Sequence, residues 1–156
     1  MGKEGLPGRS PAWSGWLEGA AERLYAFYPY RDLGRRGEAV AARYLRRRGL
    51  RILRRNFHVR SGEIDLIALS GDTVVFIEVK ARAGVKRGEL VERIDLLKAS
   101  RVRRAAGVYR RFIRNRYSRF RLDGVVVEFR PGFAGRPVPA SVRWYPSLYP
   151  LDEGDS

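Results

Sequence analysis

Cysteine is absent from this chain of 156 residues, and histidine occurs only once, as His58. The absence of cysteine excludes disulfide bonds, thiolate zinc sites, iron–sulfur clusters and cysteine nucleophiles. The single histidine excludes chemistry that needs a histidine pair. No apolar run approaches the roughly 20 residues that span a bilayer, and the first residues show no apolar segment typical of a signal peptide. The sequence therefore predicts a cytoplasmic protein that does not associate with a membrane.

The charge of the chain is strongly one-sided. Arginine and lysine together number 32 against 17 aspartates and glutamates, so the net charge is +15 and the isoelectric point is near 11.1. Only four of the basic residues are lysines, and 28 are arginines. A domain this basic is typical of proteins that bind a polyanion, of which nucleic acid is the commonest. A solvated, arginine-rich surface without such a partner is the alternative.

The length fits one domain, which we place at residues 34–150. Residues 1–33 form a predicted N-terminal extension, in which apolar residues recur every three or four positions and indicate an amphipathic helix that ends before Pro29. Its aromatic face would pack on the domain or on a second subunit. A role at a membrane surface is the weaker alternative, because its polar face has few lysines and arginines. The acidic tail 151–156 is expected to fray.

Inside the domain, hydrophobic periodicity and turn residues predict a helix, three strands, a helix and a strand. The expected ranges are a helix at 34–49, strands at 50–57, 62–69 and 73–82, a helix that begins within 90–95 and ends near 114, and a strand at 120–129. The proline- and glycine-rich stretch 131–139 is predicted to be a loop, and 141–145 an edge strand. This order predicts an α/β fold with a central mixed β-sheet flanked by helices.

The strands at 62–69 and 73–82 are predicted to form a hairpin, because a short loop containing glycine joins them. Side chains alternate between the two faces of a strand, so the loop length decides which residues lie opposite each other. A two-residue loop at 71–72 places Asp65 directly opposite Glu78. A two-residue loop at 70–71 would keep the same faces together but place Asp65 opposite Phe76, and a loop of odd length would break the arrangement.

Two carboxylates directly across a ladder have Cβ atoms about 4.5–5.5 Å apart and repel each other. A divalent cation between them turns the repulsion into ligation, and oxygen ligands of this kind suit Mg²⁺ or Mn²⁺. Lys80 shares the predicted face of Glu78, where its ammonium could reach a metal-bound water or a phosphate oxygen. The alternative is a solvated hairpin face of mixed charge, because Glu-x-Lys tripeptides are common.

Two further charged residues lie beside predicted apolar stripes. Glu38 is in register with Ala41 and Leu45 on the first helix, so its carboxylate would point toward the sheet edge. The helix dipole also favours a glutamate in a first turn, which is an alternative explanation. Lys98 lies at the centre of the apolar stripe of the second helix, where a lysine must meet an anion or extend its ammonium to solvent.

The combination of these features resembles a known family. Glu38 on a first helix, GEIDLI at 62–67, VVFIEVKAR at 74–82 and a helix that carries Lys98 are similar to the YraN-like family of the PD-(D/E)xK nuclease superfamily. That family is described as distantly similar to archaeal Holliday-junction resolvases. The similarity runs over residues 34–129 and implies a restriction-endonuclease-like core with the order α-β-β-β-α-β.

The resemblance also implies roles for individual residues. Superfamily members bind metal through the aspartate of the first hairpin strand and the glutamate of the ExK motif, which here are Asp65 and Glu78. The lysine of that motif, here Lys80, would position or activate the attacking water. An acidic residue on the first helix, here Glu38, would assist the metal, usually through water. Lys98 completes the catalytic candidates, and Mg²⁺ or Mn²⁺ is the expected cofactor.

The resemblance implies a metal-dependent endonuclease that hydrolyses phosphodiester bonds in DNA, with branched or junction DNA as a candidate substrate. Arginines would hold the phosphates in a salt-dependent and largely sequence-independent manner. The candidates are Arg46, Arg47, Arg48, Arg54, Arg55, Arg82, Arg103, Arg110 and Arg114. Because a junction resolvase cuts two strands, a symmetric homodimer is the economical expectation.

Two other functions are compatible with the sequence. One is a nucleic-acid-binding module on a nuclease fold, acting on RNA or ribosomes with little or no cleavage, because a fold does not determine its function. The other is an interfacial membrane protein that uses the aromatic helix predicted before Pro29.

Overall fold

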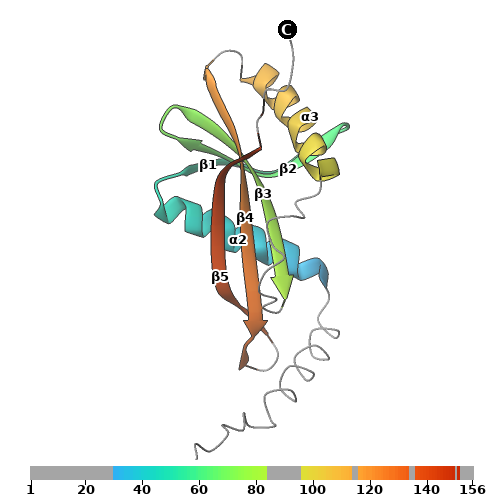
Figure 1. Cartoon of the computed structure of the whole chain (residues 1–156), viewed down its shortest axis with the longest axis vertical. Coiled ribbons are helices and arrows are strands. Elements are labelled where there is room, and N and C mark those ends of the chain that lie inside the picture. Colours follow the sequence, from blue (N-terminus) through green and yellow to red (C-terminus); the bar gives the residue numbers. More distant parts are fainter. Residues whose placement is uncertain (1–29, 84–95, 114–115, 134–135, 150, 152–156) are drawn as a thin grey trace, which may run out of the picture.

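The computed structural model describes residues 30–83, 96–113, 116–133, 136–149 and 151 (Figure 1). The predicted helix before Pro29, the predicted start of the second long helix, Arg114 and the end of the acidic tail lie outside these ranges. The described helices and strands follow one another in the predicted order. They are α2 (Tyr30–Arg47), β1 (Arg51–Val59), β2 (Gly62–Ser70), β3 (Thr73–Ala83), α3 (Leu96–Phe112), β4 (Arg119–Pro131) and β5 (Pro137–Tyr149).

The five strands form one mixed sheet in the order β1-β2-β3-β4-β5. Neighbouring strands are antiparallel except for β3 and β4, which run parallel. Parallel neighbours need a crossover connection, and α3 belongs to the connection between these two strands. α2 and α3 pack on opposite faces of the sheet (Figure 1). The protein therefore has the predicted α/β fold, which is consistent with a restriction-endonuclease-like core.

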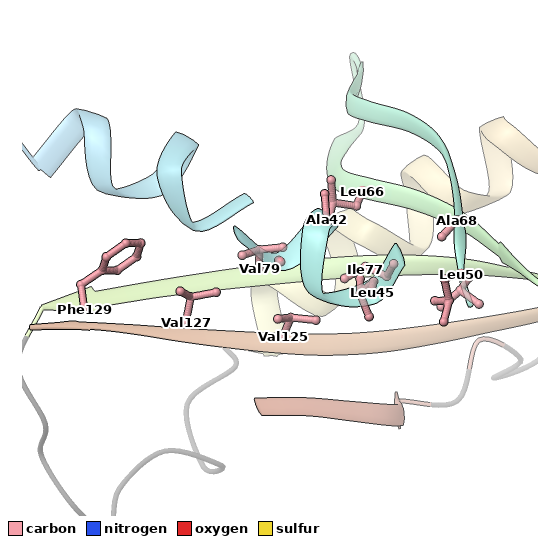
Figure 2. Close-up of a cluster of buried hydrophobic side chains, with 12 residues drawn as sticks. Ala42, Leu45, Leu50, Leu66, Ala68, Ile77, Val79, Val125, Val127 and Phe129 are labelled. Atoms are coloured by element: carbon pink, nitrogen blue, oxygen red, sulfur yellow. The ribbon is translucent and has the colours of Figure 1, made fainter. Parts of the chain in front are cut away.

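Figure 2 shows the apolar cluster between α2 and the sheet, which we call the α2 cluster. The helix contributes small side chains, Ala41 and Ala42, together with Leu45, and this lets its backbone approach the strands closely. A Cβ atom added to Gly37 would lie only 2.6 Å from the Cβ of Ala81 on β3. The buried partners outside the helix are Leu50, Leu66, Ala68, Val75, Ile77, Val79, Val125, Val127 and Phe129.

A second cluster, the α3 cluster, fills the opposite face. Its buried members are Phe57, Ile64, Ile67, Val74, Phe76, Val102, Ala105, Ala106 and Leu122. Tyr109 of α3 packs edge-on against Phe57 and Phe76, with ring centroids 5.3 and 5.9 Å apart. Burial of a side chain such as Leu or Phe contributes roughly 1.5–3 kcal/mol, so each helix is held to the sheet mainly by this packing.

β3 contributes alternate residues to the two clusters, because it lies between β2 and β4 in the middle of the sheet. Val75 and Ile77 face α2, whereas Val74 and Phe76 face α3. A strand buried on both faces has an almost continuous apolar sequence, which explains the run from Val74 to Ile77. The charged residues that follow this run therefore extend from the centre of the fold.

The structure corrects several predicted boundaries. α2 begins at Tyr30, four residues before the predicted start. The predicted loop at 131–139 is too long, because β4 reaches Pro131 and β5 begins at Pro137. β5 is also far longer than the predicted edge strand at 141–145. Prolines are tolerated in a strand at the edge of a sheet, where their missing N–H faces away from a partner.

No helix in the described ranges has both the length and the apolar composition needed to cross a bilayer.

Candidate functional site

The hairpin between β2 and β3 has the predicted two-residue loop, because Ser70 pairs with Thr73. Regular pairing ends at Leu66 opposite Ile77. One residue further, the same register places Asp65 opposite Glu78. The two-residue loop and the register from Ser70 to Leu66 are thus confirmed, whereas the facing of the two carboxylates stays a prediction.

The Asp65 carboxylate interrupts the ladder between β2 and β3. The backbone N–H of Val79 donates a hydrogen bond to Asp65 Oδ2, with a distance of 2.7 Å. In a regular antiparallel ladder with this register, that N–H would donate to the carbonyl of Ile64. A side-chain oxygen has therefore replaced a backbone acceptor, and it holds the carboxylate against β3 within one residue of Glu78.

At the level of Asp65 and Glu78, which we call the carboxylate row, the side chains of β1 and β2 switch from one face of the sheet to the other. Leu66 belongs to the α2 cluster and Ile64 to the α3 cluster, although residues two apart on a regular strand face the same way. Beside them on β1, Asn56 has a positive φ of 50°, and the next residue, Phe57, pairs with Ile64. Asparagine enters the left-handed region more readily than most residues do. This local reversal explains why simple alternation does not decide the direction of Asp65.

Glu38 of α2 joins this row from above the sheet. Its side chain is hydrogen-bonded to Asn56, and it lies near the negative charge of Asp65. Partial burial, followed by the charge of Asp65, raises the pKa of Glu38 above its usual value of 4.5, although Asn56, Arg55 and Arg35 act in the opposite direction. α2 therefore brings the carboxylate of Glu38 near that of Asp65.

Glu78 is buried in the middle of the sheet, with 4% of its surface exposed, and it pairs with Gly124 of β4. Its neighbours Ile77 and Val79 face α2, so alternation places Glu78 on the other face. Lys80 shares that face and is half-buried. Burial of a carboxylate costs free energy unless it is paired or ligates an ion, so a glutamate retained here is a candidate for such a role.

The carboxylates do not form a ready three-ligand group. Among the described residues, no three histidine, cysteine, aspartate or glutamate side chains are close enough together to hold a metal ion. Glu38 and Asp65 interact electrostatically, whereas Asp65 and Glu78 are related through the register and the Val79 hydrogen bond. A metal at this row would complete its coordination with water or substrate oxygens.

The arginines predicted to bind nucleic acid are distributed over several surfaces. Arg46, Arg47 and Arg48 are exposed at and just after the end of α2, and Arg82 and Arg103 are half-buried. On β1, Arg54 pairs with Ile67 of the α3 cluster and Arg55 with Leu66 of the α2 cluster. These two neighbours therefore leave the edge strand on opposite faces. Arg110 stacks over Phe120 at 4.4 Å, and the side chain of Lys98 lies outside the described part of the chain.

The structure also reveals a buried carboxylate that the sequence reading did not single out. Asp123 of β4 is fully buried and accepts two hydrogen bonds from Arg121, at 2.8 and 3.0 Å. It also accepts bonds from Trp144 Nε1 and from the backbone N–H of Ser147, each at 2.9 Å. These bonds fix the irregular end of β5 to β4, so Asp123 is a structural residue. The sequence did contain one sign of this role, because Asp123 is a charged residue within an otherwise apolar strand.

Together, these features define a strongly basic α/β protein in which α2 and β2 bring the carboxylates of Glu38 and Asp65 near each other, beside a buried glutamate, Glu78, on β3. The chain belongs to the Uncharacterised protein family UPF0102, whose sequence model matches residues 37–127. The matched range contains Glu38, Asp65 and Glu78.

Curated relatives support the same membership. The chain is 42% identical over 112 residues to a UPF0102 protein of Clavibacter michiganensis subsp. michiganensis, and the alignment covers 72% of this chain and 93% of that protein. It is 42% identical over 107 residues to a UPF0102 protein of Mycobacterium bovis, covering 67% and 84% respectively. For a UPF0102 protein of Chlorobium chlorochromatii, the identity is 48% over 81 residues, covering 52% and 63%.

Proposed function

We propose that this protein is a metal-dependent endonuclease of the PD-(D/E)xK type that hydrolyses phosphodiester bonds in DNA. The observation that carries the proposal is the Asp65 carboxylate, held by the N–H of Val79 where the ladder breaks, in the row of the buried Glu78. Burial of a glutamate near a second carboxylate costs free energy unless the carboxylate is paired or ligates an ion, which supports a functional role for Glu78.

The residues present fit a divalent cation of the magnesium class. Asp65 and Glu78 offer oxygen ligands only, and the chain has no cysteine and a single histidine. Mg²⁺ and Mn²⁺ prefer oxygen ligands and commonly use one or two carboxylates together with water and phosphate. A bound ion would polarise the scissile phosphate and lower the pKa of a water molecule. Asp65 and Glu78 would hold that ion.

The other two residues of the row would act on water and phosphate. Lys80 lies two residues after Glu78 on the same face of β3, so its ammonium would donate hydrogen bonds to the phosphate and offset its growing negative charge. Glu38 would accept a hydrogen bond from a water molecule held beside Asp65. Hydrolysis would proceed by in-line attack of water on phosphorus, with cleavage of the bond to the 3′ or 5′ oxygen of a deoxyribose, while the water gives up a proton and the departing oxygen takes one up.

The charge of the molecule supports a nucleic-acid substrate. A net charge of +15 attracts a polyanion over a long range, and arginine binds phosphate with a planar, two-pronged geometry. The resemblance to resolvases further suggests junction DNA as the substrate and a homodimer as the active form, and both are part of the proposal.

The test is cleavage of labelled four-way junction, linear duplex and single-stranded DNA with Mn²⁺, Mg²⁺ or EDTA. We expect cleavage that requires metal and that falls at least a hundredfold in Glu78→Gln and Asp65→Asn. Lys80→Ala should lose cleavage and yet retain the rise in melting temperature that Mn²⁺ causes, because lysine does not ligate the ion.

Asp72→Asn is the matched control, since Asp72 is an exposed carboxylate at the tip of the same hairpin. It should cleave at the wild-type rate. Cleavage at an undiminished rate in purified Glu78→Gln would show that the activity belongs to another site or to a contaminant.

A second candidate function is a DNA- or RNA-binding module with little or no cleavage. It is favoured by the finding that Glu38, Asp65 and Glu78 are not gathered into a three-ligand group. In that case the protein would bind nucleic acid in EDTA, Mn²⁺ would not raise its melting temperature, and no substrate would be cut.

A further inference from the structure

A pocket lined by basic side chains lies at the turn between β1 and β2. It has a volume of about 490 Å³ and is formed by this turn together with α3. Its basic side chains are His58, Arg60, Arg101 and Arg104, and its single acidic side chain is Glu63.

The turn and α3 are fixed against each other, so the pocket is preformed. A Cβ atom on Gly62 would overlap the backbone carbonyl oxygen of Arg101, which means that the helix backbone rests directly on the turn. Arg104 Nε donates a 3.0 Å hydrogen bond to the carbonyl oxygen of Ser61. This bond uses one of the five N–H donors of the guanidinium.

The charge in the pocket is strongly unbalanced. Arg60 comes from the turn, whereas Arg101 and Arg104 lie one helical turn apart on α3, so two distant segments bring three permanent cations to one cavity. Glu63 is engaged with His58, with 3.4 Å between Oε2 and Nδ1. Converging cations repel one another unless an anion neutralises them, and the guanidinium group matches the geometry of a phosphate.

The pocket lies on the same strand as the carboxylate row. Gly62, which lines it, is three residues from Asp65, a distance of about 10 Å along a strand. Each strand of DNA rises about 3.4 Å per nucleotide. Because the strand also winds around the helix axis, neighbouring phosphates are farther apart than this rise, so a phosphate in the pocket would be about one or two nucleotides from a phosphodiester bond placed at Asp65.

We propose that this pocket binds a backbone phosphate of the nucleic acid and holds the strand on one side of the bond to be cut. The inference rests on the proposed function for the position of the scissile bond. The site itself is a phosphate site, and its occupancy can be measured without cleavage.

The first experiment measures DNA binding by fluorescence anisotropy with the full chain in EDTA, where no metal-dependent cleavage occurs. The pocket variant is Arg60→Gln with Arg101→Gln, and both residues are exposed. The matched control is Arg130→Gln with Arg136→Gln, which removes the same charge from exposed residues near the β4–β5 connection.

We expect the pocket variant to bind about tenfold more weakly at 0.1 M salt, the loss typical of one charge-assisted phosphate contact. The slope of log K against log salt should fall by about one. The control should lose less than threefold. Equal losses in the two variants, at unchanged melting temperatures, would show that only net charge matters and would overturn the proposal.

The second experiment locates the phosphate. Single methylphosphonate linkages, which are neutral, replace the phosphates of the DNA one at a time. One replacement, about one or two nucleotides from the cut, should weaken binding of the wild type and leave binding of the pocket variant unchanged. If every replacement weakens both proteins equally, no individual phosphate occupies the pocket.

Two further arms separate the possible failures. If millimolar inorganic phosphate raises the melting temperature of the wild type while the pocket and control variants bind DNA equally, the pocket takes a small free anion and the proposal is wrong. If the protein binds DNA as expected but never cuts it, the nuclease proposal fails and the phosphate site stands. If it cuts DNA and the pocket variant binds normally, this inference alone fails.

Discussion

At the scale of single residues, Asp65 accepts a hydrogen bond from the backbone and is also a proposed metal ligand. Its Oδ2 accepts the hydrogen bond of Val79, and its charge lies beside Glu38. Removal of the carboxylate and removal of its charge should therefore have opposite effects on stability.

Asp65→Ala is expected to lower the free energy of unfolding by about 1–3 kcal/mol, because the N–H of Val79 loses its acceptor. Asp65→Asn keeps an acceptor oxygen and removes repulsion from Glu38, so it should be at least as stable as the wild type without metal. Urea denaturation in EDTA measures both values. Equal losses in the two variants would show that the hydrogen bond does not stabilise the fold.

Glu38 predicts a pH dependence with a definite sign. Its pKa is raised in the folded protein, so the folded state binds that proton more tightly than the unfolded chain does. The ionisation of Glu38 therefore removes stability as the pH rises above about 4.5, the ordinary value. Glu38→Gln keeps an acceptor for Asn56 and should raise the melting temperature at pH 7.5 but not at pH 4.

Asp72→Asn serves as the control for this comparison, because Asp72 is exposed on the hairpin loop. Its effect on the melting temperature should be small at both pH values. A stabilisation by Glu38→Gln that is the same at pH 4 and pH 7.5 would exclude a titration of Glu38 as its cause.

At the scale of helices and strands, the closeness of α2 to β3 determines where Glu38 meets the sheet. Gly37 precedes Glu38 and lies almost in contact with Ala81. Gly34, one turn earlier on the same helix, has open space around it. The two glycines of α2 therefore differ in what a methyl group would meet.

Gly34→Ala should stabilise the protein by up to about 1 kcal/mol, the difference in helix propensity. Gly37→Ala gains the same propensity but forces the helix away from β3, which should cost about 1–3 kcal/mol. Thermal denaturation of the two variants tests the difference. A Gly37→Ala variant as stable as Gly34→Ala would mean that α2 can move from β3 without loss.

Most helices and strands could be predicted because each is specified by a periodic pattern within its own segment of the sequence. The apolar stripe of α2 and the run from Val74 to Ile77 each satisfy one simple rule. β5 could not be predicted in the same way, because its prolines indicate a loop and its strand conformation depends on pairing with β4. Long-range pairing of this kind leaves little signal in the segment itself.

The candidate site likewise has features that the local sequence specifies and features that depend on contacts between distant segments. The two-residue loop was predictable from the glycine between the strands, and its register would place Asp65 opposite Glu78. The role of Asn56 was not, because it depends on a left-handed residue on a neighbouring strand that meets a helix side chain. The hydrogen bond of Val79 to Asp65 likewise requires the ladder to open, which no local pattern specifies.

At the scale of the whole molecule, positive charge covers several surfaces of the fold. The exposed arginines of α2, β1 and α3 come from both faces of the sheet and from its edge. A nucleic acid that contacts this protein is therefore expected to be held largely through its phosphates.

The affinity for DNA should consequently be steeply dependent on salt and nearly independent of sequence. With six or more phosphate contacts, the association constant should fall about a thousandfold between 50 and 200 mM salt. Anisotropy titrations with two unrelated duplexes of equal length measure this, and both should give the same slope. A slope near zero, or a large preference for one sequence, would contradict binding through phosphates.

The central place of β3 has a consequence for how the protein unfolds. The strand that carries Glu78 and Lys80 is hydrogen-bonded on both edges, and its apolar half is covered on both faces. Backbone amides in such a strand exchange with solvent deuterium only when the entire domain opens. Amide exchange at Ile77 and Val79 should thus be among the slowest in the chain, and heat inactivation should coincide with global melting, without an earlier, local stage.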